Sequence, residues 1–130
     1  MRRVLIVFAM MAAGLLGLQQ ARAAEVMKYT PEAFAEAQAA GMPIVVHIAA
    51  KWCPTCAAQR PILEKIEQEA AYNNVRVLLV DFDTQKDVVR AMGATMQSTL
   101  VVFHGTKEMA RTVGDTNAQS IAATVRRSLV

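Results

Sequence analysis

Two cysteines separated by two residues carry the most specific chemical signal in this sequence. Cys53 and Cys56 flank Pro54-Thr55 where an apolar run of strand character gives way to helical periodicity. A cysteine at a helix N-terminus is favoured as a thiolate, because free backbone N–H groups and the helix dipole stabilise negative charge there. We therefore expect Cys53 to attack a disulfide. Cys56, one turn further in and better covered, would then resolve the mixed disulfide.

Other roles for this cysteine pair have weaker support. A structural disulfide closing so small a loop would restrain little of the unfolded chain's entropy. A zinc site needs four ligands, and one C-x-x-C with scattered histidines does not supply that spacing. We predict no bound metal and no organic cofactor, since Cys53 and Cys56 themselves carry the two electrons. Two alternatives stay open: a metal-binding module that uses both thiols and a histidine, and a redox-inert interaction domain.

The elements that must position the cysteines follow from hydrophobic periodicity and turn residues. We expect helices over residues 33–40, 54–71 and 84–92 and strands over 44–49, 75–82, 100–103 and 109–113, with a last helix capped by Asp115 or Thr116. Alternating strands and helices imply parallel pairing of the first strands, and the closing hairpin adds an antiparallel edge. The pattern predicts an α/β fold, a central mixed sheet with helices on both faces.

The first 23 residues have the layout of a targeting segment. Arg2 and Arg3 precede an uncharged apolar run over residues 4–18, and an A-x-A pattern ends at Ala23. This arrangement predicts a secretory signal peptide cleaved after Ala23, because the run is shorter than the about 20 apolar residues that span a bilayer. The domain at 24–130 would then work in a bacterial periplasm or a similar oxidising space. It would meet the membrane only if the segment stays uncleaved.

Length and charge limit the remaining function classes. A chain of 130 residues allows one modest domain. The 14 Lys and Arg against 11 Asp and Glu give a formal net charge of +3. Three of these arginines lie in residues 1–23, so the rest of the chain is balanced at 11 of each sign. Charge therefore gives no support to a nucleic-acid partner.

From about Tyr29 to Leu129 the sequence resembles the thioredoxin superfamily. The resemblance rests on the run Ala50-Lys51-Trp52-Cys53-Pro54-Thr55-Cys56, on Pro61 eight residues after Cys53, and on the spacing of residues 93–99. It implies a thioredoxin-like three-layer sandwich and a thiol–disulfide oxidoreductase. The implied partners are protein thiols or disulfides and an upstream redox partner. From this resemblance alone we expect the protein to act as a reductase.

Two departures from the superfamily pattern concern residues near the cysteines. Ser98, followed by Thr99, stands where the family has a cis-proline, so we expect the Gln97–Ser98 peptide to be trans. That loop pairs with substrate in the family, which makes Ser98 and Thr99 candidates for substrate positioning. Trp52, next to Cys53, is a third candidate. We also expect Trp52 to shield the disulfide and pack locally.

His47 is the second departure. It lies six residues before Cys53, where thioredoxins carry a buried acid. It is a candidate proton relay for Cys56, since a histidine has an unperturbed pKa near 6.5. If charged, it would favour the Cys53 thiolate. The alternative is a buried histidine hydrogen-bonded to backbone or water.

Overall fold

The computed structural model describes residues 23–130, so the predicted signal peptide lies outside the described residues except for Ala23. The chain builds a five-stranded sheet in the order β1-β3-β2-β4-β5. The strands are β1 (Glu25–Lys28), β2 (Pro43–Ala49), β3 (Arg76–Asp81), β4 (Thr99–His104) and β5 (Lys107–Val113). The helices are α1 (Pro31–Ala39), α2 (Pro54–Glu67), α3 (Lys86–Ala91) and α4 (Ala118–Arg126), with short 3-10 turns at η1 (Ala70–Tyr72) and η2 (Arg127–Leu129).

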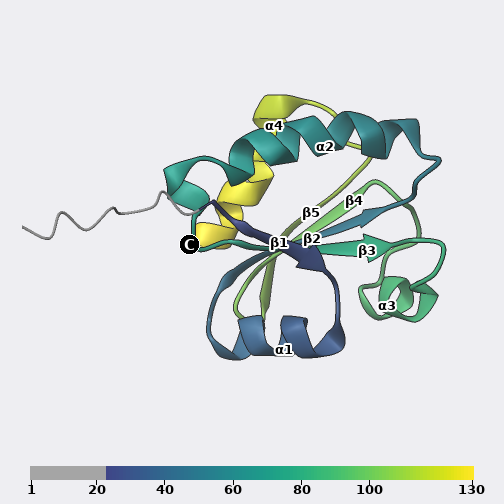
Figure 1. The fold of residues 1–130 in the computed structure, drawn as a ribbon. Coiled ribbons are helices and arrows are strands. Elements are labelled where there is room, and N and C mark those ends of the chain that lie inside the picture. Colours follow the sequence, from purple (N-terminus) through teal and green to yellow (C-terminus); the bar gives the residue numbers. More distant parts are fainter. Residues whose placement is uncertain (1–22) are drawn as a thin grey trace, which may run out of the picture.

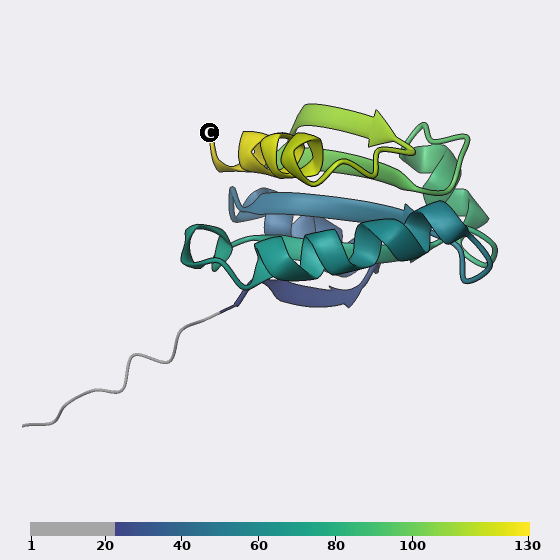
Figure 2. The same cartoon turned by 90° about the horizontal axis from the view of Figure 1, so that it is seen from above.

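The sheet is mixed, as the sequence predicts. β3 pairs in parallel with both β1 and β2, whereas β4 runs antiparallel to β2 and to β5. Helices α2 and α4 lie side by side on one face, and α1 and α3 cover the other (Figure 1, Figure 2). The predicted three-layer α/β sandwich is confirmed. In residues 23–130 no helix has the length and apolar character needed to cross a membrane.

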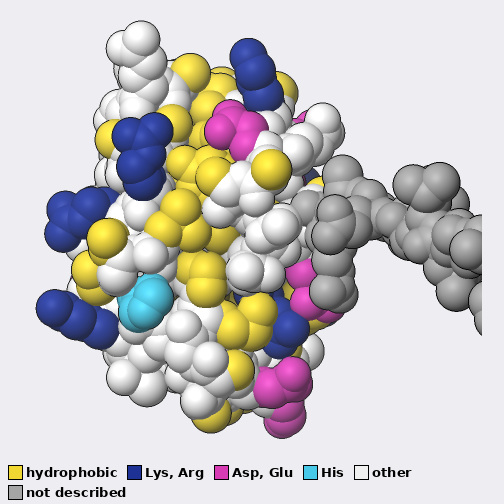
Figure 3. Space-filling view, turned by 90° about the vertical axis from the view of Figure 1, so that its left-hand side faces the viewer, with side chains coloured by type: hydrophobic (Ala, Val, Ile, Leu, Met, Phe, Trp, Pro, Cys, Tyr) yellow, Lys and Arg dark blue, Asp and Glu magenta, His cyan; other side chains and the backbone are white. Residues whose placement is uncertain are grey.

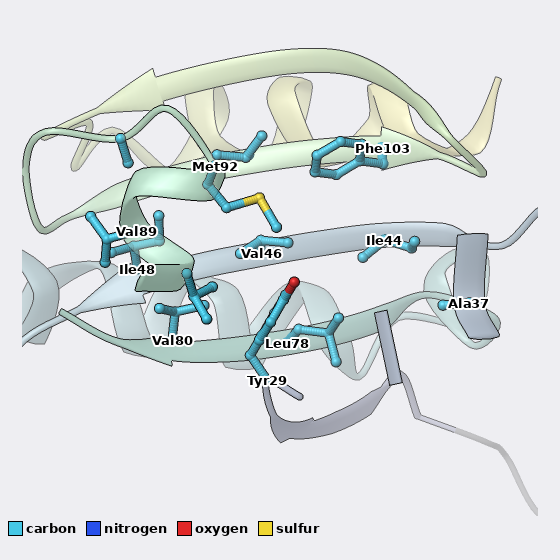
Figure 4. Packing of buried hydrophobic residues seen from close by; sticks show 13 residues of the cluster. Tyr29, Ala37, Ile44, Val46, Ile48, Leu78, Val80, Val89, Met92 and Phe103 are labelled. Atoms are coloured by element: carbon cyan, nitrogen blue, oxygen red, sulfur yellow. The ribbon is translucent and has the colours of Figure 1, made fainter. Parts of the chain in front are cut away.

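Alternation along β2 divides the core into two layers and decides where His47 lies. Successive side chains of a strand point to opposite faces. Ile44, Val46 and Ile48 pack in the cluster below the sheet with residues of α1 and α3 (Figure 4). Val45 packs in the cluster above it with residues of α2 and α4. His47 lies two residues after Val45 and therefore points to the same face of the sheet, where it is buried beneath α2.

Apart from shifts of one or two residues at element ends, the structure differs from the expected elements in three places. β1 was not predicted, because its four residues are mostly exposed and show no apolar alternation; backbone pairing with β3 makes it a strand. α2 ends at Glu67, four residues before the expected end, and η1 follows. The cap of α4 is Asn117, whose side chain accepts a hydrogen bond from the Ser120 N–H, so the predicted caps Asp115 and Thr116 are wrong.

Candidate active site

Cys53 occupies the N-cap of α2, directly after the turn that leaves β2. Its backbone is extended, and Pro54 starts the helix with a φ that suits this position. The Cys53 Sγ accepts a hydrogen bond from the Cys56 backbone N–H at 3.1 Å. The sulfur therefore sits where an N-capping oxygen usually sits, in contact with a helix end that stabilises negative charge.

Both cysteines are free thiols, and both are buried. Cys53 is 3% exposed and Cys56 is 4% exposed, so the expectation that Cys56 is better covered is wrong. The capping geometry turns the Cys53 sulfur inward, where both residues pack with Ala49, Ala50 and Phe82.

The surroundings of Cys56 favour its protonated form. Burial raises the pKa of the Cys56 thiol, and a hydrogen bond to Cys53 raises it further. Backbone groups of Ala50 and Ser98 act in the opposite direction and lower this pKa. Cys56 can therefore donate a proton to the Cys53 sulfur, which suits a thiol that acts second.

A pocket of about 640 Å³ opens beside the cysteine pair. Cys53, Cys56 and His47 line it together with Leu79, Val80 and small residues around the turn after β2. Four charged residues also contribute to its wall: Lys28, Lys51, Arg60 and Asp81. The two thiols thus line a pocket whose wall contains apolar side chains and three basic residues against one acidic residue.

His47 is buried and neutral at physiological pH. Its Nε2 lies 3.0 Å from the Oε1 of Gln59. Burial lowers the pKa of His47 to about 4, the nearby Arg60 charge lowers it too, and the Gln59 hydrogen bond partly opposes them. A charged His47 that promotes the Cys53 thiolate is therefore excluded near pH 7. Its partner is a side chain rather than the backbone or water of the alternative prediction.

The loop before β4 has an unusual backbone at Ser98. The Gln97–Ser98 peptide is trans, as predicted, and Ser98 has φ +55°, the left-handed region. The Ser98 hydroxyl donates to the Gln97 carbonyl at 2.6 Å, and the Thr99 hydroxyl donates to the Met96 carbonyl at 2.7 Å. Both side chains are buried, and both hydroxyls bond to carbonyls of the loop before β4. Ser98 and Thr99 can therefore position a substrate only through the backbone that they shape.

Trp52 stands out on the surface next to the buried cysteines. It is 60% exposed, so the expectation that it packs locally is wrong. Its indole N–H donates to the Asp83 Oδ2 at 2.9 Å, which anchors the ring to the segment after β3. An anchored, exposed indole fits the predicted contact with substrate.

Gln59 is the residue of this site that sequence reasoning missed. It lies on α2 between Cys56 and Leu63, which are both buried, and it is itself fully buried. A polar residue on the buried face of a helix is the signal that could have found it. In contrast, His104 pairs with Pro43 at the other end of the sheet, where its Nδ1 contacts the Ser128 carbonyl.

The described part of the chain offers no ready set of metal ligands. Within residues 23–130, no three His, Cys, Asp or Glu side chains gather as a cluster that could hold a metal ion. The Nε2 of His47 is already engaged with Gln59. A metal-binding module would thus have the thiols of Cys53 and Cys56 and no evident third ligand there.

The family model for thioredoxin matches residues 25–127, which is almost the whole described chain. The chain belongs to the thioredoxin family. Because the homologues in this family are thiol–disulfide oxidoreductases, the protein is an enzyme of that class, as the sequence predicts.

Individual relatives agree with this assignment. A thioredoxin of Chlamydia muridarum is 30% identical over 94 residues, which cover 72% of this chain and 89% of that protein. A bifunctional thioredoxin reductase/thioredoxin of Mycobacterium leprae is 31% identical over 81 residues, 62% of this chain and 18% of that protein. The crystal structure of Trxlp from Edwardsiella tarda has a TM-score of 0.76 and 34% identity, covering 78% of this chain and 98% of that one.

Proposed function

We propose that this thioredoxin-family protein is an exported reductase of protein disulfides, with Cys53 as the nucleophile and Cys56 as the resolving thiol. The observation that carries the proposal is the geometry of Cys53. Its sulfur caps the 14-residue helix α2 and accepts the Cys56 N–H, next to a Cys56 thiol whose pKa is raised by burial. A helix N-terminus presents N–H groups and the positive end of the helix dipole, which suits the sulfur that attacks disulfides.

The reaction takes place in two exchanges. The Cys53 thiolate attacks one sulfur of a substrate disulfide, and the other substrate sulfur leaves as a thiolate and takes up a proton. Cys56 then loses its proton and attacks Cys53, which forms the Cys53–Cys56 bond and releases the second substrate sulfur. Two electrons pass to the substrate, and a separate dithiol donor must reduce the protein again.

The substrate would approach over the exposed indole of Trp52 and the loop of Ser98 and Thr99. The anchored Trp52 ring provides apolar contact, and the loop provides backbone groups. A folded protein disulfide fits this surface better than an isolated small molecule, because the contacts extend over two segments separated in sequence. The name of the M. leprae relative supports a thioredoxin reductase as the class of upstream donor.

Export rests on residues 1–23, whose pattern is that of a signal peptide. Cleavage after Ala23 would leave Ala24 as the first residue. The Ala24 backbone N–H donates to the Glu67 carbonyl at 2.8 Å, so the domain has ordered contacts from this residue onward. This placement supports a mature chain of residues 24–130.

Trapping of substrates tests the exchange chemistry. A Cys56→Ser variant exposed to an extract of the exported proteins should retain partners through Cys53, and dithiothreitol should release them. A Cys53→Ser/Cys56→Ser variant is the matched control and should retain none. Absence of any Cys53-dependent partner would favour the redox-inert interaction domain. Stoichiometric metal after anaerobic purification would favour the metal-binding module.

The reduction potential tests the direction. Equilibration of the Cys53–Cys56 pair with glutathione or dithiothreitol buffers should give a value near about −270 mV, which is typical of thioredoxin. A value near about −120 mV would mean that the protein inserts disulfides and would contradict the proposed reductase role.

A further inference from the structure

Gln59 is a buried polar side chain that the two exchanges described above do not use. It lies three residues after Cys56 on α2, and residues three apart on a helix share a face. The Gln59 side chain therefore projects from α2 on the same side as the Cys56 thiol. It is fully buried, so each of its polar atoms needs a partner within the protein.

The Gln59 amide makes three hydrogen bonds to three different segments. Its Nε2 donates to the Ser98 carbonyl at 3.1 Å and to the Asp115 carbonyl at 2.9 Å. Because both contacts require N–H groups, the orientation of the amide is fixed, and Oε1 is the atom 3.0 Å from the His47 Nε2. Gln59 thus ties α2 to β2, to the loop before β4 and to the segment after β5.

The hydrogen bond between Gln59 and His47 fixes which ring nitrogen of His47 carries the hydrogen. An amide oxygen can only accept, so the His47 Nε2 must carry the hydrogen. In the neutral ring the remaining nitrogen, Nδ1, is then the one that can accept a proton. His47 and Cys56 line the same pocket, so this choice of tautomer bears on the surroundings of the resolving thiol.

The hydrogen bond from Gln59 to the Ser98 carbonyl helps to fix the Ser98 backbone. The Ser98 carbonyl accepts from both the Gln59 Nε2 and the Gly114 N–H. Ser98 has the left-handed φ of +55°, a conformation that a non-glycine residue adopts only when its surroundings impose it. In that conformation the Ser98 backbone acts on the Cys56 thiol and lowers its pKa, against the effect of burial.

We propose that Gln59 is a positioning residue for the resolving step: it holds the Ser98 backbone beside the Cys56 sulfur and fixes the tautomer of His47. The inference rests on the proposed exchange function. In this step the Cys56 proton passes to solvent, and the Cys56 sulfur bonds to the Cys53 sulfur. The bond from Cys53 to the substrate sulfur breaks, and that sulfur leaves with the electron pair.

Ellman's reagent separates the two steps in one experiment. The reduced protein should release one thionitrobenzoate when Cys53 attacks the reagent and a second when Cys56 displaces the mixed disulfide. Gln59→Met has similar size but no amide. We expect it to slow the second release by about tenfold and to leave the first within about twofold, because a buried hydrogen-bond network is lost only around Cys56. The pH profile of the second release should move to higher pH.

Three further variants make the result specific. Leu63→Met introduces the same side chain at a buried position of the same helix that makes none of the three hydrogen bonds, and it should release both equivalents at the normal rates. Gln59→Glu keeps an acceptor for His47 but, when ionised, has no donor for the Ser98 carbonyl, so it should also slow the second release at pH values where the carboxyl is ionised. Cys56→Ser should release one equivalent only.

The outcomes distinguish this inference from the proposed function. A normal second release in both Gln59→Met and Gln59→Glu would overturn the positioning role and leave the exchange chemistry intact. A normal second release in Gln59→Glu alone would show that the hydrogen bond from Gln59 to the Ser98 carbonyl does not contribute. Absence of a second release in the unmodified protein would overturn the exchange function itself. If Gln59→Met fails to fold by circular dichroism, the comparison with Gln59→Glu decides.

Discussion

His47 illustrates how one side chain can be part of a redox site without being charged. It lies on the α2 face of β2, next to a thiol pair that benefits from positive charge. Burial and the Arg60 charge keep it neutral, and Gln59 rather than a carboxylate is its hydrogen-bond partner. The start of α2 supplies the hydrogen bond that a charged His47 does not, because the Cys56 N–H donates to the Cys53 sulfur there.

The neutral His47 makes the stability of the protein depend on pH. Its pKa is about 4 in the folded state against 6.5 for an unperturbed histidine, so between these limits the unfolded chain binds a proton that the folded chain does not. The free energy of unfolding should therefore fall as the pH decreases from 6.5 to 4, by about 3 kcal/mol, with no contribution above 6.5. Urea denaturation at several pH values measures this slope.

The control for this prediction replaces one histidine at a time. His47→Gln should lose most of the slope between pH 6.5 and 4, whereas His104→Gln, which leaves the buried ring in place, should keep it. Equal slopes in His47→Gln and the unmodified protein would show that His47 is not held neutral by the fold.

At the scale of elements, the loop before β4 shows how the fold accommodates a serine in place of the family's proline. Ser98 has a trans peptide and a φ of +55°. Its carbonyl is held by the Gln59 amide and by the Gly114 N–H, and the hydroxyls of Ser98 and Thr99 bond within the loop. Contacts from neighbouring elements thus fix a backbone that the residue itself disfavours.

Substitutions at Ser98 should reveal that strain. Glycine adopts positive φ at little cost, so Ser98→Gly should stabilise the protein by up to about 1 kcal/mol. Proline is locked near φ −65°, so Ser98→Pro should destabilise it by about 3 kcal/mol. Gln97→Gly is the matched control and should destabilise, because it only adds freedom to the unfolded chain. Urea denaturation distinguishes these results; unchanged stability in Ser98→Pro would refute the argument.

The elements that the sequence predicted are those with a strong hydrophobic periodicity or with clear start and stop residues. The helix expected over residues 33–40 is α1, which starts at Pro31 after the Thr30 cap, and the expected apolar strand before Cys53 is β2. β1 gave no signal because backbone pairing rather than side-chain pattern creates it. The hydrogen-bond partner that His47 and Ser98 share could not be predicted from the sequence either. Gln59 contacts both residues only because α2 packs on the sheet.

At the scale of the whole molecule, the cysteines and the start of the described chain lie at opposite ends. β1 and β2 both run parallel to β3, so Glu25 lies at the edge of the sheet away from the end of β2 that leads to Cys53. Figure 3 views the molecule from the end where the described chain begins, with hydrophobic side chains exposed between charged ones. The thiols therefore lie at the end of the sheet away from Glu25.

The same geometry gives a prediction about the stability of a chain that begins at Ala24. Cleavage after Ala23 would convert the Ala24 nitrogen into an ammonium group, 2.8 Å from the carbonyl of Glu67, the last residue of α2. A positive charge at a helix C-terminus contributes about 0.3–1 kcal/mol. The chain of residues 24–130 should therefore be more stable with a free α-amino group than with an acetylated one, by about 0.5 kcal/mol, and salt should reduce the difference.

Thermal unfolding of both forms, at low and high sodium chloride, provides the measurement. The control is a chain that carries a short Gly-Ser extension before Ala24, in which acetylation neutralises an amine far from Glu67 and should change nothing. An acetylated chain as stable as the free one would mean that α2 does not interact with a charge at Ala24. The expected stabilisation by a free amine at Ala24 would then be refuted, and the cleavage position would have to be established from the mass of the exported protein alone.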